Sequence, residues 1–299
     1  MNRRTWIQLL GVGGAVSLAG CGSAGSSTVT AEITDEHLTL ATATTVHDSG
    51  LLTELITGFQ REFGAAVDAI ARGSGAALET ARNGDCDIVL VHARPLEDAF
   101  LRDGYGVNRR AVMVNDFLVV GPPDDPAGVA GLGPVAAFEA IATADAPFVS
   151  RGDRSGTHLR ERRLWSETSI DPDGSWYTET GQGMGDTLVI AEQAEAYTLC
   201  DRGTFLNVAE DQLVAYVEGG IEDPPPLLRN EYGVIPVNPA RREVAYRLGM
   251  AFVGYLTGAG QTRIDGFRIG GEQAFRSMSS SEISAFEQYV PRDWKQNSA

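Results

Sequence analysis

The sequence contains almost no lysine. Of its 24 lysine and arginine residues only Lys295 is a lysine, while 40 residues are aspartate or glutamate and the formal net charge is −16. A charge of this sign excludes a protein that binds nucleic acid through bulk electrostatic attraction. An acidic excess without lysine resembles proteins from salt-saturated surroundings, where a carboxylate-rich surface keeps a protein soluble. We therefore expect a halophilic protein with no nucleic-acid partner.

Cysteine is also scarce, with three residues in the whole chain. Cys21 falls in the N-terminal segment, whereas Cys86 and Cys200 lie in what we expect to be different lobes. We predict that the latter two are small buried side chains, although an oxidising compartment leaves a disulfide between them open.

The N-terminal segment has the features of an export signal. Arg3 and Arg4 precede an apolar run that is too short to span a bilayer, for which about 20 apolar residues are needed. The run ends in Leu18-Ala19-Gly20-Cys21, which resembles a lipoprotein processing site. We expect residues 1–21 to be a twin-arginine signal, Cys21 to carry a lipid at the extracellular face of the cell membrane, and residues 22–36 to be a flexible tether. The alternative is an ordinary secretory signal with an incidental cysteine.

The rest of the chain alternates short apolar strands with amphipathic helices, which is typical of α/β layers. Helices are expected at 50–63, with Asp48 or Ser49 as the cap, at 76–82, which stops at Asn83-Gly84, and from 251 onward. Six strands are predicted, at 38–43, 66–71, 88–91, 116–120, 147–150 and 232–237.

Two proline-rich breaks, at 121–126 and 223–226, divide the chain. If both mark crossings between lobes, residues 37–120 and 231–290 form lobe 1 and residues 121–230 form lobe 2. Two connecting segments then make a hinge, as in binding proteins that close on a ligand.

Four turns share one local design, in which a strand leads through small and hydroxyl residues into a helix. They lie at 42–45, 73–75, 151–157 and 181–186. The first N–H groups of a helix lack partners and carry partial positive charge, so an anion binds well there. One such turn usually does no more than cap its helix. Four in one chain, two from each lobe, predict a cleft where helix N-termini converge on one small anion.

The third turn carries the most specific signal. Arg151 supplies a cationic fork that suits an oxyanion, Asp153 can hold the guanidinium, and Ser155, Gly156 and Thr157 present further donors. The alternative is a surface turn whose charges pair only with each other.

Several motifs in order along the chain resemble the tungstate-binding proteins of ABC importers. They are LATATTVHDSGLL at 40–52, residues 83–87 with 91–93, GYGVNRR at 104–110, residues 115–117, the turn at 151–157, GQGMG at 181–185, residues 196–199 with 201–204, and residues 232–234. The resemblance implies a type II periplasmic-binding-protein fold, an α/β architecture of two lobes with central mixed sheets. It also implies oxyanion contacts from Thr44, Thr45, Ser74, Arg151, Ser155, Gly156, Thr157, Met184 and Gly185.

The chain departs from the family pattern at two positions. Ala43 and Cys200 stand where threonine is usual, and the first removes one hydroxyl near the ligand. Behind the contacts we expect a second layer of side chains formed by Asp153, His92, Tyr197, Asp201 and Arg202.

Phosphate is the main rival ligand, because the third turn also resembles that of phosphate-binding proteins. Phosphate keeps a proton near neutrality and so benefits from a carboxylate acceptor, whereas tungstate, molybdate and sulfate are proton-free dianions. After the strand at 88–91, where phosphate binders tend to offer an aspartate, the chain reads His92-Ala93-Arg94. The preference for tungstate, and its separation from molybdate, rest on the resemblance alone.

An enzyme is the competing class. A hydrolase would need Ser155 beside a base, but 152–156 lacks the spacing of a nucleophile elbow. The histidines and cysteines make no close pair of metal ligands, so we expect neither a metal site nor a cofactor. The expected partners are an ABC permease with its ATPase, and the protein itself is expected to be a monomer. A ligand sensor without transport stays open.

Overall fold

The computed structural model describes residues 36–209 and 212–278. All of them belong to one compact unit, Ala31–Ala299. The predicted signal, Cys21, all of the tether but its last residue, and the predicted end of lobe 1 after residue 278 lie outside the described residues. Among the described residues, no helix has both the length and the apolar character needed to cross a membrane.

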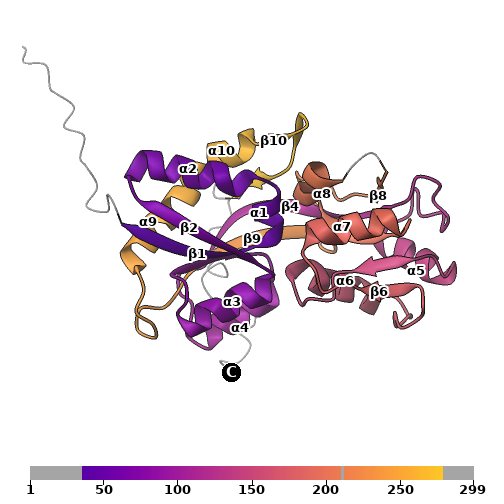
Figure 1. Ribbon diagram of the computed structural model, residues 1–299, viewed down its shortest axis with the longest axis horizontal. Coiled ribbons are helices and arrows are strands. Elements are labelled where there is room, and N and C mark those ends of the chain that lie inside the picture. The colour runs from indigo at the N-terminus through magenta and orange to yellow at the C-terminus, as the bar shows by residue number, and fades with distance from the viewer. Residues whose placement is uncertain (1–35, 210–211, 279–299) are drawn as a thin grey trace, which may run out of the picture. The chain divides into compact units, whose positions relative to one another are not determined.

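The main sheet combines parallel and antiparallel strands (Figure 1). Three parallel strands lie at one side, and β9 (Arg229–Pro236) then runs antiparallel to both β3 (Ile88–Val91) and β4 (Arg110–Gly121). The order across the sheet is β12 (Arg276–Ser277), β4 (Arg110–Gly121), β9 (Arg229–Pro236), β3 (Ile88–Val91), β1 (His37–Ala43) and β2 (Ala66–Arg72).

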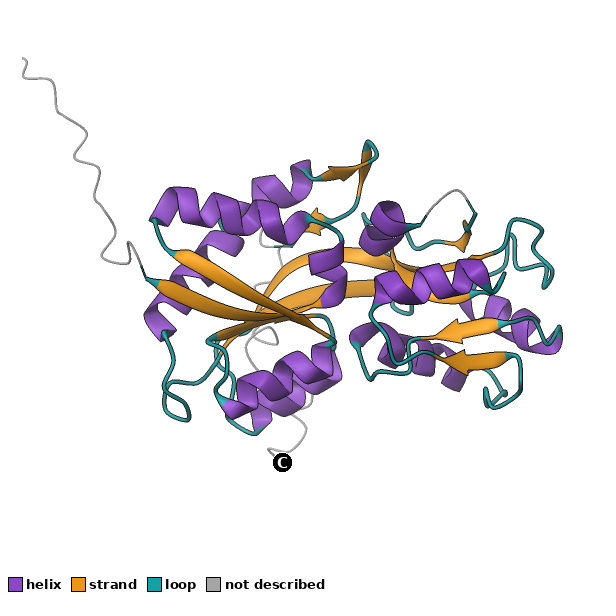
Figure 2. Ribbon diagram, in the orientation of Figure 1, coloured by secondary structure: helices purple, strands orange, loops and turns teal. Residues whose placement is uncertain are grey.

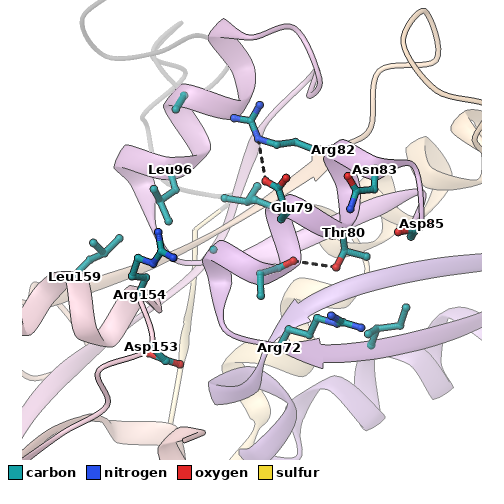
Figure 3. Close-up of a pocket in the computed structure, with 15 residues that line it drawn as sticks. Arg72, Glu79, Thr80, Arg82, Asn83, Asp85, Leu96, Asp153, Arg154 and Leu159 are labelled. Carbon is teal, nitrogen blue, oxygen red and sulfur yellow. Dashed lines mark hydrogen bonds and ion pairs between the residues drawn. The ribbon is translucent and has the colours of Figure 1, made fainter. Parts of the chain in front are cut away.

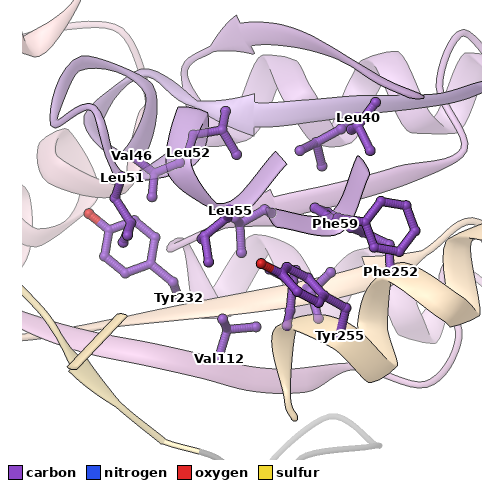
Figure 4. Packing of buried hydrophobic residues seen from close by; sticks show 14 of the residues in the cluster. Leu40, Val46, Leu51, Leu52, Leu55, Phe59, Val112, Tyr232, Phe252 and Tyr255 are labelled. Atoms are coloured by element: carbon purple, nitrogen blue, oxygen red, sulfur yellow. The ribbon is translucent and has the colours of Figure 1, made fainter. Parts of the chain in front are cut away.

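Helices cover both faces of this sheet. On one face α2 (Leu51–Phe63), α9 (Tyr246–Leu256) and α10 (Gly260–Gly266) share a core with the strands, where Phe59 packs edge-on against Phe252 (Figure 4). On the other face α3 (Ser74–Asn83) and α4 (Arg94–Arg102) pack on a second cluster. Two covered faces explain why β3 is apolar at every position instead of alternating.

Strand β4 changes its partners along its length. Up to Asp116 it pairs with β9, and from Phe117 it pairs with β7 (Thr198–Asp201) and then β8 (Val214–Val217). The second group of elements has its own core, centred on Phe138, Phe148 and Trp165. It also contains β5 (Phe148–Ser150), β6 (Tyr177–Glu179), α5 (Pro134–Thr143), α6 (Gly156–Glu167), α7 (Met184–Gln193) and α8 (Arg202–Val208), visible in Figure 2.

The division into two lobes follows from these separate cores. The predicted boundaries at 121 and 231 stay a prediction, and we propose that the first crossing lies inside β4. Phe117 N donates to Leu228 O at 2.7 Å, so the outgoing and returning segments are hydrogen-bonded where the strand partners change. A crossing made by paired strands can bend as one hinge.

Most predicted elements are confirmed, with shifted bounds. Strand β4 begins at Arg110, six residues before the prediction, and α3 ends at Gly84 in the left-handed conformation, with φ 87°. A short helix, α1 (Thr44–Asp48), was not predicted. The predicted cap of α2 was wrong, because Gly50 is its N-cap with φ 85°, although Ser49 Oγ accepts a 3.4 Å hydrogen bond from Leu51 N.

Cys86 and Cys200 are both buried, and both are free thiols. Cys86 packs in the cluster under α3 and α4, whereas Cys200 packs beside Met184 in a different cluster. They therefore act as small buried side chains, as predicted.

Candidate functional site

The four turns meet each other in space, and two contacts tie the third turn to its neighbours. A methyl group built on Gly73 would lie 3.1 Å from Asp153 Oδ2 and 3.5 Å from Ser155 Cβ, so the second and third turns are in contact. Gly181 N donates to Arg151 O at 2.8 Å, which joins the fourth turn to the third.

The remaining contacts join the first turn to the fourth and to the second. A methyl group on Gly183 would lie 3.9 Å from Thr44 Cγ2, so the fourth turn reaches the first. The first and second turns are linked through His92, whose Nε2 lies 3.3 Å from Thr45 Oγ1 and whose backbone N donates to Ser74 Oγ at 3.4 Å. The predicted convergence of the four turns is therefore present in the structure.

Several donors at this meeting point are buried and unused. Arg151 is 1 % exposed, and its Nε and Nη1 find no hydrogen-bond partner among the described residues. The hydroxyl oxygens of Thr44 and Thr157 are also buried without a partner within that part of the chain. Buried donors left unpaired are costly, so their grouping indicates a place for a ligand that accepts hydrogen bonds.

The nearby carboxylates are held by donors of the protein itself. Asp153 Oδ2 accepts from Arg151 Nη2 at 2.5 Å, and its Oδ1 accepts from Ser155 N at 3.0 Å. Asp201 caps α8 by accepting from Thr204 N at 3.0 Å and from Thr204 Oγ1 at 2.7 Å. Burial raises the pKa of Asp201 to about 6, against the lowering effect of these bonds and of the nearby Arg151 charge. Asp153 is therefore held within the third turn, and Asp201 is held at the start of α8.

The helix starts explain where the other predicted contacts lie. Ser155 is the N-cap of α6 and its Oγ accepts from His158 N at 3.2 Å, so Gly156 and Thr157 form the first turn of that helix. Met184 and Gly185 open α7 in the same way, with Met184 fully buried. Both helices present their first N–H groups beside the unused donors.

Two residues of the predicted second layer make their hydrogen bonds elsewhere. Tyr197 donates to Asp125 Oδ1 at 2.7 Å, inside the second group of elements. Arg202 forms a bidentate pair with Asp116, at 2.7 and 2.9 Å, on β4. Neither side chain is hydrogen-bonded to any of the four turns.

Three polar residues of the main sheet were missed as site residues. Asn230 and Tyr232 of β9 and Asn115 of β4 are buried and reach toward the first turn and His92. Asn115, inside the apolar run of β4, carried a signal in the sequence, since buried polar groups need partners. Asn230 lies between two charged residues near the start of β9 and carried no such signal.

Two cavities flank the site. The larger, of about 910 Å³, lies between α3, α4 and the third turn, where Arg154 lies beside Leu96 (Figure 3). The second, of about 790 Å³, lies beside His92 and Gly156 and is lined by six arginines: Arg94, Arg102, Arg160, Arg162, Arg163 and Arg229. Thr44, Arg151 and Thr157 line neither of these two cavities, and the unused donors are themselves buried.

Comparison with known proteins agrees with this geometry. The model of the PBP superfamily domain, the superfamily of periplasmic-binding proteins, matches residues 23–260. The chain belongs to the PBP superfamily. A chain of two α/β lobes joined by paired strands is the type II PBP fold, as the resemblance implied.

Relatives narrow the family within this superfamily. A Haloferax volcanii protein, named provisionally as an ABC transporter anion-binding protein, is 49 % identical over 97 % of this chain and 90 % of its own length. The tungstate-binding protein TupA of Peptoclostridium acidaminophilum is 40 % identical over 77 % of this chain and 80 % of its own. The crystal structure of the tungstate ABC transporter from Geobacter sulfurreducens has 44 % identity and a TM-score of 0.71, covering 78 % of this chain and 99 % of that one.

This PBP chain is therefore a member of the family that includes the tungstate-binding proteins. Its relatives are binding proteins of transporters, and proteins of this kind act outside the cytoplasm.

Proposed function

We propose that this chain captures a proton-free tetrahedral oxyanion, with tungstate as the first choice and molybdate as the second, and delivers it to an ABC importer. The observation that carries the proposal is the group of buried donors on Thr44, Arg151 and Thr157 that lack partners among the described residues where the four turns meet. Four oxygens of one small anion can satisfy donors that converge from several directions.

The proposed contacts are of three kinds. Arg151 supplies the charge through Nε and Nη1, and hydroxyl groups donate from Thr44, Ser74, Ser155 and Thr157. Backbone N–H groups at the starts of α1, α3, α6 and α7 add donors, and they place Thr45, Gly156, Met184 and Gly185 around the anion.

The set of engaged acceptors favours a dianion without protons. Hydrogen phosphate must donate its own hydrogen, and we propose that neither nearby carboxylate turns to accept it, because Asp153 is held by Arg151 and Ser155 and Asp201 by Thr204. An unpaired buried donor costs about 1–3 kcal/mol. The choice of tungstate over molybdate and sulfate rests on the names of the relatives.

The proposed cycle is capture, closure and delivery. Contacts from both lobes favour the closed form once the anion has entered, so binding shifts the population toward closure. We propose that the chain works as a monomer, that Cys21 anchors it to the membrane after twin-arginine export, and that the closed form docks on a permease served by an ATPase. The acidic, lysine-poor composition supports a halophilic setting.

We propose no enzymatic role. The ring of His158 accepts a 3.0 Å hydrogen bond from Arg154 N through Nδ1, and Ser155 Oγ caps the helix, so the two side chains do not form a nucleophile and its base. A sensor role would use the same site, and loss of tungstate uptake on deletion of the gene would separate transport from sensing.

Isothermal calorimetry with tungstate, molybdate, sulfate and phosphate tests the proposal on the purified chain. We expect tight binding of tungstate and molybdate and weak or no binding of phosphate. Tight phosphate binding without a response to tungstate would sink the substrate assignment.

A further inference from the structure

A closed ring of hydrogen bonds lies directly behind the first turn. It joins Thr45, His92, Asn230 and Tyr232, all of them buried. Nδ1 of His92 lies 2.7 Å from Asn230 Oδ1, and its Nε2 lies 3.3 Å from Thr45 Oγ1. Tyr232 Oη donates to Thr45 Oγ1 at 3.1 Å and accepts from Asn230 Nδ2 at 3.0 Å.

The amide group of Asn230 sets the direction of two bonds in the ring, those to Tyr232 and to His92. Its amide nitrogen donates to Tyr232 Oη and, at 2.8 Å, to Asn115 Oδ1, so its oxygen faces His92. A carbonyl oxygen can only accept, so the hydrogen of the imidazole must sit on Nδ1.

The imidazole is neutral under ordinary conditions. Burial lowers the pKa of His92 to about 4, and the charge of Arg151 acts in the same direction, while the bond to Asn230 opposes it. A neutral imidazole with its hydrogen on Nδ1 has a bare acceptor at Nε2. Because Tyr232 already donates to Thr45 Oγ1, the Thr45 hydroxyl hydrogen points to that nitrogen.

We propose that His92 is a positioning residue that sets which protonation state of an oxyanion the site accepts. Nε2 of His92 accepts a hydrogen bond from the Thr45 hydroxyl group, so this nitrogen is not available to a ligand. The same bond directs the Thr45 hydroxyl hydrogen away from the ligand. This role rests on the proposed oxyanion-binding function and makes it more specific. Thr45 then donates to the anion through its backbone N–H alone. Its hydroxyl group keeps His92 Nε2 from accepting a hydrogen bond from the ligand.

The ring stands where it can act on the ligand. A methyl group on Gly156, in the third turn, would lie only 2.7 Å from Cε1 and Nδ1 of His92, so the imidazole edge faces the loop that carries Arg151. The Nε2 atom lies at the first turn, 3.3 Å from Thr45 Oγ1. Without the Thr45 hydroxyl hydrogen, this nitrogen would offer hydrogen phosphate an acceptor. Occupied, it leaves fully deprotonated anions as the better ligands.

The first test examines the ring without any ligand. Nitrogen-15 NMR of the full chain, which has four histidines, reports the tautomer of each imidazole, and His92→Gln identifies the His92 signals. We expect His92 at pH 7 to be neutral with its hydrogen on Nδ1. A hydrogen on Nε2, or a protonated ring at pH 7, would overturn the proposal.

The second test measures specificity. Thr45→Val keeps the shape of the side chain but removes the hydrogen that occupies His92 Nε2, whereas Thr45→Ser restores a hydroxyl. We expect Thr45→Val to raise the ratio of phosphate to tungstate affinity at least about tenfold in calorimetry, and Thr45→Ser to bring it back toward the native value. An equal ratio in the native chain and Thr45→Val would overturn the specificity role.

The two tests separate failure of this inference from failure of the proposed function. If the native chain bound neither tungstate nor phosphate, both the proposed function and the specificity role would be wrong. The tautomer of His92 would still show whether the ring of hydrogen bonds exists. If Thr45→Val failed to fold, two other measurements would test the specificity role of His92. They are the tautomer of His92 in the native chain and the ratio of phosphate to tungstate affinity in His92→Gln.

Discussion

Arg151 uses one of its three guanidinium nitrogens on Asp153, and the other two lie buried without a partner among the described residues. Two unpaired buried donors raise the free energy of the closed form without a ligand. A bound acceptor removes this cost. We expect Arg151→Ala to weaken tungstate binding by about 2–4 kcal/mol, because a charge-assisted bond to a desolvated anion is lost. Calorimetry measures the loss, with Arg162→Ala on the exposed side of α6 as the control, since its side chain is 47 % exposed. Equal losses in both variants would show that general charge, and not this site, governs binding.

Removing the Thr44 hydroxyl group should weaken ligand binding without lowering the stability of the free protein. Its oxygen is buried and has no partner in the described part of the chain, so removing it should not weaken the ligand-free fold. We expect Thr44→Val to lower tungstate affinity about tenfold while the melting temperature of the free protein stays equal or rises. Thr53→Val, at an exposed position of α2, should change neither quantity. A lower melting temperature with unchanged affinity would remove Thr44 from the site.

Glu161 makes stability depend on pH just behind the third turn. Its carboxyl is buried and accepts bonds from Ser150, Trp165 and Tyr177, yet burial raises its pKa to about 7. The pKa is higher in the folded state than in the unfolded chain, so this stabilisation is complete below about pH 4.5 and is lost as the pH rises through 7.

We therefore expect the stability of Glu161→Gln relative to the native chain to improve between pH 5 and pH 8, by at most about 3 kcal/mol. Chemical denaturation at the two pH values measures it. The contribution of His92, whose lowered pKa acts in the opposite direction, is common to both proteins and cancels. A difference that does not change with pH would mean that the Glu161 carboxyl titrates normally.

At the scale of elements, the sequence predicted what depends on local pattern. Strands buried on both faces showed as apolar runs, and the left-handed stop at Gly84 was visible because asparagine and glycine end helices. Helix α1 has five residues, too few to display a helical period. The first half of β4 was missed because Arg110 and Asn115 interrupt its apolar character, and pairing with β9 overrides that local signal.

The site shows the same limit more strongly. The four turns could be found from the sequence because each is a local design of a strand, a turn and a helix start. Asn230 could not, because its partner His92 is 138 residues away, and no local pattern encodes that contact. The second layer itself stays a prediction: Asp153 and His92 are hydrogen-bonded to residues of the turns, whereas Tyr197 and Arg202 hold other parts of the fold.

The start of α6 lies very close to the residue that follows β3. A methyl group on Gly156 would lie 2.6 Å from His92 O, closer than real side-chain carbons come to backbone oxygens. We expect Gly156→Ala to weaken tungstate binding about tenfold or more, because full closure is blocked. Gly254→Ala is the matched control, since this helical glycine of α9 has open space around it and alanine favours a helix. Calorimetry and small-angle X-ray scattering with and without tungstate should show a variant that binds weakly and stays more open.

At the scale of the whole molecule, binding and closure are one equilibrium in the proposed mechanism, and the contact between the second and third turns allows it to be locked. The Cβ atom of Ser155 lies 3.5 Å from the position of a Cβ on Gly73, within the range of a disulfide. Gly73 has ordinary extended angles, with φ −60°, so cysteine can replace it without backbone strain. The native thiols Cys86 and Cys200 are buried and should not compete.

We expect the double variant Gly73→Cys with Ser155→Cys to trap tungstate when it is oxidised in the presence of the anion. Dissociation should slow at least about a hundredfold, because the lobes can no longer separate, and a reducing agent should restore fast release. Comparing oxidised and reduced forms of the same protein removes the effect of the lost Ser155 hydroxyl, and Gly73→Cys alone controls for the added thiol. Stopped-flow measurement of anion exchange gives both rates. Oxidised protein that releases tungstate as fast as the reduced form would mean that the anion leaves without the lobes opening, and the closed site would then not be what retains it.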